Sequence, residues 1–564
     1  MRPGILLTVA AMMLSLPGVY GAGAFAEEPA ALAAADIRSY LDTDFPCAVT
    51  RVDAGLEKIR VCGKTDGSGG FSLCELMPSD DIGGAGAFRC RLEGTDFNLS
   101  FDRYVTRDGV TYDRTLSRWI IVRTGDGENR PASHARYAGR IEPVQRPRPL
   151  VPASKKGLGD VVADPLMTGD LDSLGIANAT VNIRITTFMY SGPGAGRIVH
   201  EYGGEKYYFD AGHVAALDKA LTECRDRRIA VAAIILINNA ASSADPETGM
   251  LLQHPDYTPE GNYSMPDMTT FRSVRAYAAA LDFLASRYCR PDGRYGRIHY
   301  WIMHNEVDSG LEWTNMGPGK PVEVYMDTYV KSMRLCHNIV RRYDPHAWVM
   351  ASHTHAWAVA DNPKTYATRE MLEILNGFSR AEGDFRWGLA FHCYPQSLYE
   401  PKTWLDEKAL YADDAPIVTY RNLEVIDRWI RSERNLYQGR RKRPLWLSEN
   451  GTNSPSYSEK DQCEQAAGFA WGWKKISSLD GIDAHVWHNW SDNEAEYGLR
   501  IGLRKFSSEG KGPKEVWNVY RAAGTPQEDG VFRKYLEVIG IGDWDIMQDV
   551  CGSCSLSEKP RSAF

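Results

Sequence analysis

The chain has 564 residues, of which 43% are hydrophobic and 24% are charged, and its formal net charge at pH 7 is −8. This composition is that of a soluble globular protein, and the length exceeds one average domain, so we expect two domains. The net negative charge and a sequence pI near 6.0 argue against a nucleic-acid-binding surface, and the basic run at 440–443 is too short to change that.

The N-terminus has the layout of a secretory signal. Arg2 precedes an apolar stretch from Ile5 to Leu16, and Ala24-Phe25-Ala26 comes directly before Glu27. We therefore predict that residues 1–26 are a signal peptide. Since no later run reaches about 18 uninterrupted apolar residues, we expect a secreted or periplasmic protein with no integral membrane segment after signal removal.

Cysteine usage fits an oxidising compartment. The chain has 11 cysteines, and the first stretch after the signal contains Cys47, Cys62, Cys74 and Cys90. We expect two disulfides among these four, with three possible pairings that the sequence does not distinguish. Cys551 and Cys554 have the spacing of a small closed loop, and the βαβ pattern that favours a redox motif does not follow them.

Residues from about Asp36 to Pro147 form a glycine-rich stretch of short alternating runs, such as Phe97 to Phe101 and Trp119 to Arg123. This pattern predicts a small β-rich domain, and the proline-rich segment 146–152 favours a joint after it. The predicted division is a signal peptide (1–26), a β-rich accessory domain (27–150) with disulfides, an α/β domain (151–525) and a C-terminal tail (526–564) of unassigned role.

Beyond the joint, apolar runs alternate with amphipathic helical stretches, as in successive βα units. Helix candidates at 273–288, 322–343 and 461–475 are long enough to return the chain to a parallel neighbour. We therefore predict an α/β fold, a (β/α)8 TIM barrel preceded by the small β-rich domain, with 514–523 as the closing helix. The predicted strands are 155–159, 180–189, 229–238, 298–304, 347–352, 387–392, 444–448 and 482–487.

Two of these strands end in a glutamate. Glu306 ends the fourth, after Trp301-Ile-Met-His-Asn, and Glu449 follows the seventh, after Pro444-Leu-Trp-Leu-Ser. Both carboxylates are expected on the C-terminal rim, where TIM-barrel active sites lie. Cleaving a glycosidic bond needs one carboxyl that donates a proton and a second, ionised one that attacks or stabilises the sugar cation. For either glutamate alone, a salt bridge with a neighbouring cation is the competing interpretation.

The flanking residues strengthen the first interpretation. Asn305-Glu306 and Ser448-Glu449-Asn450-Gly451 resemble the two catalytic motifs of the clan A glycoside hydrolases, which are retaining (β/α)8 enzymes, and the resemblance covers roughly 155–523. It implies that Glu306 is the acid/base, that Glu449 is the nucleophile, and that Asn305 hydrogen-bonds the sugar 2-hydroxyl. Within the clan, the chain resembles an uncharacterised branch.

The end of the sixth strand carries Phe391-His392-Cys393-Tyr394. In the clan, a tyrosine from this region donates a hydrogen bond to the nucleophile, which keeps that carboxylate ionised, and Tyr394 is the candidate by position. His392 can fill the same place instead. Either residue can also be an ordinary rim residue with its hydrogen bonds satisfied.

Two further residues are candidates by resemblance. Trp487 ends the eighth strand, where clan members place an aromatic platform under the sugar. Its other interpretation is packing between barrel and helices. Arg184 matches by type an arginine that braces the nucleophile in some relatives, although it lies in the middle of the predicted second strand.

Histidines at strand ends support two rival hypotheses. His304, His353, His355 and His392 end three consecutive strands, which would suit a metal-dependent barrel hydrolase, but their spacing does not match that class. A lone histidine at a barrel mouth is more often a substrate contact, which is the role we expect for His304. A catalytically inactive carbohydrate-binding barrel is the non-enzymatic alternative, since fold alone does not establish activity.

The sequence thus predicts an exported retaining glycosidase that acts on O-glycosidic bonds of an oligo- or polysaccharide by double displacement, without a cofactor or metal. Retention requires carboxyl groups about 5 to 5.5 Å apart, whereas about 6.5 to 9.5 Å would imply inversion. Sugar specificity, exo or endo action and oligomeric state are not set by these motifs. They depend on long loops, at 191–202, 239–266, 310–321 and 396–416, that suggest a deep cleft or pocket.

Overall fold

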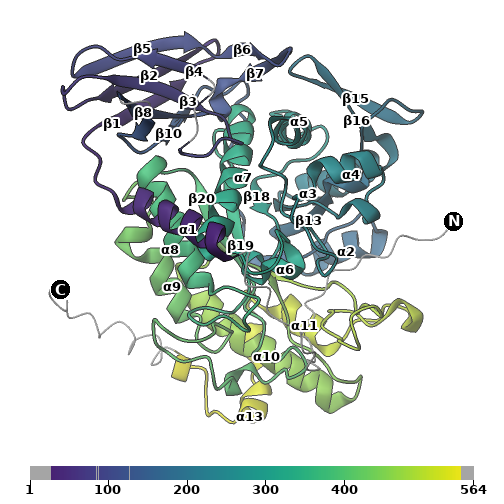
Figure 1. The fold of residues 1–564 in the computed structure, drawn as a ribbon. Coiled ribbons are helices and arrows are strands. Elements are labelled where there is room, and N and C mark those ends of the chain that lie inside the picture. Colours follow the sequence, from purple (N-terminus) through teal and green to yellow (C-terminus); the bar gives the residue numbers. More distant parts are fainter. Residues whose placement is uncertain (1–26, 84–85, 87, 126–127, 548–564) are drawn as a thin grey trace.

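A computed structural model of the chain describes residues 27–83, 86, 88–125 and 128–547 (Figure 1). The predicted signal peptide lies outside the described residues, as do Cys551 and Cys554. Within them, the predicted (β/α)8 barrel with a β-rich part before it is confirmed. None of the described helices is both long enough and apolar enough to cross a bilayer.

Eight parallel strands close into a barrel in chain order. Each overlaps one predicted apolar run, because strands buried on both faces carry continuous apolar sequence. The barrel strands are β12 (Lys156–Leu158), β13 (Asn178–Arg184), β17 (Ala230–Leu236), β18 (Tyr300–Met303), β19 (Trp348–His353), β20 (Trp387–Phe391), β21 (Leu445–Asn450) and β22 (Ala484–Trp487).

Alternate residues of each strand fill the inside of the barrel, and the others face the helices. Ile234, Ile302, Met350 and Trp446 belong to the inner cluster, with small residues such as Ala232 between them. The outward residues join a much larger core beneath the helices. This alternation decides which rim side chains reach the mouth.

The helical layer follows the prediction closely. The four predicted helices correspond to α5 (Phe271–Tyr288), α7 (Val322–Tyr343), α10 (Glu459–Ser478) and α11 (Glu515–Ala522). Side-chain caps fix two of the starts, since Thr270 accepts from the amide of Ser273 and Ser458 from that of Asp461. The other helices of the layer include α2 (Pro165–Ser173), α3 (Ala211–Asp226), α8 (Thr368–Glu382) and α9 (Glu424–Arg431).

The N-terminal part is built from two main sheets, ordered β11-β1-β2-β5 and β10-β8-β3-β4, with β9 paired to β8. Trp119 and Phe101 stack in the core between them, with ring centroids 5.1 Å apart. The strands are β1 (Ala48–Ala54), β2 (Lys58–Lys64), β3 (Phe71–Leu76), β4 (Phe88–Arg91), β5 (Asp96–Asp102), β8 (Arg118–Gly125), β9 (Glu128–Pro131), β10 (Arg136–Tyr137) and β11 (Arg140–Ile141).

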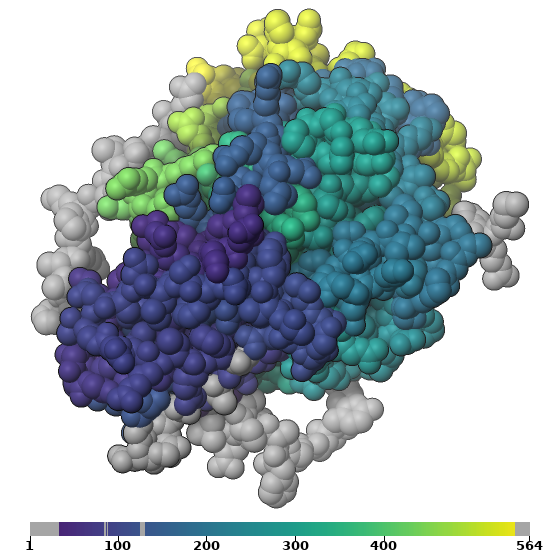
Figure 2. Space-filling view, turned by 90° about the horizontal axis from the view of Figure 1, so that it is seen from above, coloured from purple at the N-terminus to yellow at the C-terminus, as the bar shows by residue number. Residues whose placement is uncertain are grey.

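This part is packed onto the barrel domain and not merely tethered to it, and Figure 2 shows the two in contact on one face. Arg118 of β8 pairs with Glu382 of α8 at 2.7 Å, and both side chains are 1% exposed. The Tyr40 hydroxyl also donates to Glu382 at 3.1 Å. Tyr40 belongs to α1 (Glu27–Asp42), a helix that the sequence analysis did not predict and that lies against α7 and α8 (Figure 1).

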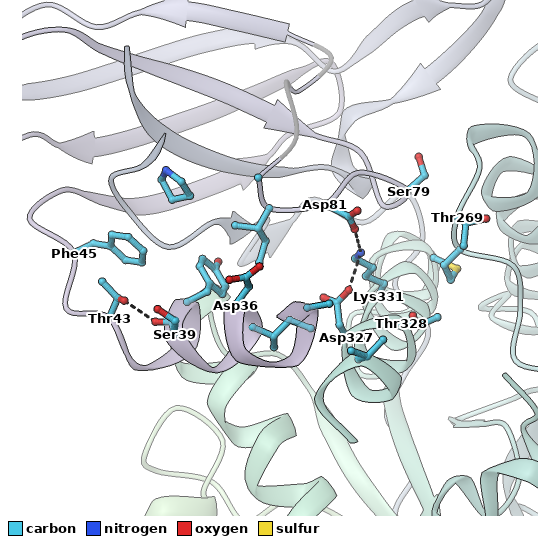
Figure 3. A pocket seen from close by; sticks show the side chains of 18 residues that line it. Asp36, Ser39, Thr43, Phe45, Ser79, Asp81, Thr269, Asp327, Thr328 and Lys331 are labelled. Carbon is cyan, nitrogen blue, oxygen red and sulfur yellow. Dashed lines mark hydrogen bonds and ion pairs between the residues drawn. The ribbon is translucent and has the colours of Figure 1, made fainter. Parts of the chain in front are cut away.

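A cavity of about 790 Å³ lies where α1, the N-terminal sheets and α7 meet (Figure 3). Lys331 of α7 projects into it and pairs with Asp327 at 2.8 Å and Asp81 at 3.3 Å. None of its lining residues is one of the strand-end residues that the sequence singled out.

The predicted disulfides are wrong for this structure, because Cys47, Cys62, Cys74 and Cys90 all have free thiols. Cys74 and Cys90 lie on paired strands, but Cys90 is opposite Leu73, so the two thiols point to opposite faces of the sheet. Cys62 lies on β2 in the other sheet, where its thiol contacts Asn98 at 3.5 Å.

The described part of the predicted tail has a structural role. It forms α12 (Glu528–Phe532) and α13 (Tyr535–Ile539), and α13 packs against α10. Phe532 and Tyr535 are fully buried in the main core. These residues complete the cover of the barrel beside β22.

Candidate active site

Glu306 and Glu449, which the sequence places 143 positions apart (449 − 306), meet at the mouth of the barrel. One carboxylate oxygen of each and one ring nitrogen of His392 all lie within 4.8 Å of one another. The two glutamates are only 3% and 5% exposed. The pair therefore sits deep in the mouth and not on its outer surface.

A β-bulge aims Glu449 into the mouth. On β21 Trp446 points inward and Leu445 and Leu447 point outward, so strict alternation would turn Glu449 outward as well. The register with β22 shifts between Leu447 and Asn450, where β21 has one extra residue. Such a bulge reverses the facing of the residues after it, and bulges are common beside active sites.

After β18, left-handed backbone likewise changes which side chains face the mouth. His304 has φ 63° and Glu306 has φ 39°. Alternation would place His304 inward with Ile302, but its ring is turned into the helical layer, where it contacts the Ile235 carbonyl at 3.1 Å and the Ser332 hydroxyl at 3.2 Å. Burial lowers the pKa of His304 to about 4. The expected substrate contact from His304 is therefore wrong, because it lies behind the barrel wall.

The surroundings of Glu306 favour its protonated form. Burial raises the pKa of Glu306, and this outweighs the opposite effect of His392, whose Nδ1 is 2.7 Å from Glu306 Oε1. Its backbone amide donates to the Ser352 hydroxyl at 3.1 Å, which fixes its place on the rim. Asn305 is buried next to it, and its carbonyl accepts from the Thr314 hydroxyl at 2.8 Å.

Glu449 has the opposite tendency. Burial alone would raise its pKa, but the His488 and His392 imidazoles and a hydrogen bond from Tyr394 hold the pKa of Glu449 below its ordinary value. The Tyr394 hydroxyl donates to Glu449 Oε1 at 3.1 Å, the contact expected from the position of Tyr394. The two carboxyls are thus driven apart in acidity, which is the pattern of an acid and base pair.

Trp487 is not at the mouth. Its side chain is fully buried and points outward, because Val486 takes the inward position, and it packs 5.4 Å from Phe469 of α10. Its indole N–H donates to the Ile501 carbonyl at 3.0 Å. The expectation of a sugar platform is therefore wrong, and the packing interpretation holds. The inward residue is the next one, His488.

Arg184 is the last residue of β13 and not a mid-strand residue as predicted. Its side chain points toward the mouth. There its positive charge lowers the pKa of Asp160 and of Tyr263, although burial raises both more strongly. Tyr263 lies beside Trp313, with ring centroids 6.0 Å apart, in the cluster that closes the barrel interior from above. These two rings come from the loops after β17 and β18.

The histidines do not form the metal site of the rival hypothesis. His353 lies against Asp308, at 3.6 Å, and His355 shares a hydrogen bond with the Tyr394 carbonyl at 3.1 Å. Within 27–547, apart from the masked positions, Glu306, His392 and Glu449 are the one group with metal-ligand spacing. In this group His392 Nδ1 shares a hydrogen bond with Glu306 Oε1 at 2.7 Å.

Three residues near the pair were not predicted from the sequence. Asp160, directly after β12, accepts from Asn182 at 3.2 Å, and it could have been found as a strand-end carboxylate. His488 could have been found by continuing the inward and outward alternation of β22, in which Ala484 and Val486 face inward. Glu496 lies in the loop after β22, where burial raises its pKa to about 7 against the opposing effect of His488 and hydrogen bonds from Asn489. No local pattern marks Glu496, because the fold of that loop brings it in.

Residues 149–547 match the model of a family described as a family of unknown function, DUF5722. The chain belongs to this family. No curated protein matches its sequence.

Solved structures with which the chain can be matched include several glycoside hydrolases. A family 39 glycoside hydrolase from Bacteroides cellulosilyticus WH2 is 15% identical, with a TM-score of 0.43 over 86% of this chain and 81% of that one. A hyperthermophilic β-glucosidase from Pyrococcus furiosus is 13% identical, with a TM-score of 0.43 over 66% and 87%. A β-glucuronidase from Bacteroides uniformis is 11% identical, with a TM-score of 0.37 over 85% of this chain, which spans about half (49%) of that protein.

Proposed function

We propose that this chain is an exported glycoside hydrolase that cleaves O-glycosidic bonds of an oligo- or polysaccharide with retention of configuration. The observation that carries the proposal is the meeting of Glu306 and Glu449 in one buried mouth, with the pKa of the first raised and that of the second lowered. A structural salt bridge would not need two acids to converge, since like charges repel.

In the first step Glu449 attacks the anomeric carbon and Glu306 protonates the oxygen of the breaking glycosidic bond. This leaves the sugar covalently bound to Glu449 and releases the remainder of the glycan. In the second step Glu306, now ionised, takes a proton from water, and the resulting hydroxide displaces Glu449 from the same carbon. The two displacements together retain the configuration.

The separation of the carboxyls supports retention over inversion. Their nearest oxygens lie within 4.8 Å, close to the spacing of about 5 to 5.5 Å between carboxyl groups that retaining enzymes use. An inverting enzyme needs about 6.5 to 9.5 Å to fit a water between base and sugar.

Neighbouring residues would act on these two. Tyr394 orients Glu449 and favours its ionised form, and His392 holds Glu306 through their hydrogen bond. Asn305 would hydrogen-bond the sugar 2-hydroxyl. Arg184 would supply a positive charge at the mouth beside Asp160. The proposed export depends on the signal-like sequence of residues 1–26.

The test uses single amide variants of each acid. Glu449→Gln should abolish hydrolysis of every substrate, because no other residue can form the covalent intermediate. Glu306→Gln should lose far more activity on unactivated disaccharides than on 4-nitrophenyl glycosides, since 4-nitrophenolate leaves without a proton. Glu407→Gln, in an exposed rim loop, is the matched control and should behave as wild type. Equal hydrolysis by wild type and Glu449→Gln, or none by the wild type on a broad panel, would contradict the proposal.

A further inference from the structure

The mouth of the barrel decides whether a glycan is cut at its end or within the chain. Cutting within a chain requires a groove that is open on two sides of the catalytic pair, so that the polymer can pass through. Cutting at an end requires only a pocket with one opening. The relevant observation is whether the rim loops, meaning the segments that follow the eight barrel strands, leave two gaps or form an unbroken wall.

Hydrogen bonds join neighbours through the first half of the rim. The most connected residue is Asn315, which bonds the β17 and β18 loops together through both its backbone and its side chain. The bonds are Trp490 Nε1 to Asp170 (2.7 Å, β22 loop to α2, the helix after β12), Asn182 to Asp160 (3.2 Å, β13 itself to β12 loop), Ala244 N to Thr186 O (2.9 Å, β17 loop to β13 loop) and Met265 N to Asn315 O (3.0 Å, β17 loop to β18 loop).

The second half is joined in the same way. The β19 and β20 loops share three backbone hydrogen bonds, Ala358 N to Ala415 O (3.2 Å) and the two given below, which makes this the most strand-like of the joints. The bonds are Tyr366 N to Asp308 O (2.9 Å, β18 to β19), Trp357 N to Pro416 O and Val418 N to His355 O (both 2.9 Å, β19 to β20), Asn453 Nδ2 to Tyr399 O (3.2 Å, β20 to β21) and Ser454 N to Arg500 O (3.1 Å, β21 to β22). Neighbouring strands or their loops are thus bonded at every step around the rim.

The wall is firmest behind the nucleophile. The β22 loop is anchored by Asp492 and Lys514, which pair at 3.1 Å with both side chains 0% exposed. From this loop Leu499 and Ile501 pack against the ring of Tyr394, whose hydroxyl binds Glu449. A buried ion pair and an apolar cluster therefore hold the loop over this side of the site, and opening it would leave two charges unpaired.

We propose that the site is a blind pocket that admits the non-reducing end of a glycan, so that the chain removes one terminal sugar at a time. This rests on the proposed function, since it takes Glu449 as the nucleophile. The sugar held in the pocket is the one whose anomeric carbon Glu449 attacks, and the rest of the glycan leaves on the side of Glu306. A further sugar on the other hydroxyls of the bound unit would meet the joined rim.

The experiment compares two forms of one oligosaccharide. Pentasaccharides of the malto, cello, laminari and manno series are labelled at the reducing end with 2-aminobenzamide, and each is prepared free or with its non-reducing unit blocked by a 4,6-O-ethylidene group. Products of the purified full chain are followed over time by mass spectrometry. Glu449→Gln is run beside it to show that the cleavage comes from this site.

The pocket predicts that a cleaved free pentasaccharide gives labelled tetra-, tri- and disaccharide in that order, with monosaccharide as the only unlabelled product. The blocked form should be cleaved at least 100-fold more slowly. Early labelled disaccharide with unlabelled trisaccharide, or equal rates on free and blocked forms, would overturn the pocket and leave the proposed function standing. No cleavage of any free pentasaccharide or aryl glycoside would instead contradict the proposed function itself.

Discussion

His392 Nδ1 lies 2.7 Å from Glu306 Oε1, a hydrogen bond that joins the ends of β20 and β18 across the mouth. The same imidazole lowers the pKa of Glu449 as well as that of Glu306. Burial lowers the pKa of His392, but the two carboxyls more than offset this and raise it above its ordinary value. One histidine therefore couples the proton donor to the nucleophile.

The pKa directions predict a bell-shaped dependence of kcat/KM on pH. Activity should rise as Glu449 loses its proton, at a pH below the ordinary pKa of a glutamic acid, about 4.3. It should fall as Glu306 loses its proton, at a pH above that value, because burial raises the pKa of this residue. A profile on an unactivated disaccharide, whose leaving group needs the proton of Glu306, measures both limbs, and a falling limb below pH ~4.3 would contradict the assignment of Glu306 as the acid.

His392→Ala should move both limbs to higher pH. His392 lowers the pKa of Glu306 and of Glu449, so its removal should raise both pKa values. The matched control is His346→Ala, an exposed histidine at the opposite end of β19. Limbs that stay in place in His392→Ala, with the fold intact by circular dichroism, would show that this histidine does not set the acidity of the pair.

Trp487→Phe should lower stability and leave KM nearly unchanged. The indole N–H bond to Ile501 is lost and a small void forms among Phe469 and Tyr520, which together reduce the free energy of unfolding by about 1 to 3 kcal/mol. Urea unfolding and steady-state kinetics measure the two effects. A large rise in KM without loss of stability would restore the platform role that the buried position argues against.

Glu382→Ala should destabilise the whole molecule. It leaves buried Arg118 without its partner and removes the acceptor of Tyr40, and breaking such a buried pair costs about 3 to 5 kcal/mol. Thermal unfolding should show the loss as one shifted transition, because the pair links the N-terminal sheets to the barrel. Asp102→Ala, which breaks an exposed pair with Lys58, is the control and should leave the midpoint in place. Two separate transitions in the wild type would contradict the linkage.

The barrel could be predicted because its strands are apolar along their whole length and regularly spaced. Glu306 and Glu449 could be found because they end such strands. Which strand-end residues face inward could not be predicted. Left-handed backbone at His304 and the bulge in β21 reverse the facing of the residues after them. On β22 alternation holds, with Val486 inward, so the resemblance that placed Trp487 at the mouth was wrong and the inward His488 was overlooked.

Features set by tertiary packing were beyond the sequence. Glu496 enters the site only because the β22 loop folds back, and no local pattern marks it. The disulfides were expected from composition, whereas the register of β3 with β4 turns Cys74 and Cys90 to opposite faces. Helix α1 was not predicted, and it is held by contacts with α7 and α8.

The most direct test is the configuration of the sugar at the moment of release. Proton NMR can follow the first minutes of hydrolysis of an aryl glycoside, before the free sugar equilibrates between its two anomers. Double displacement by Glu449 and Glu306 predicts that the first anomer to accumulate has the configuration of the substrate. If the opposite anomer appears first, water attacks the sugar directly and Glu449 is not a nucleophile.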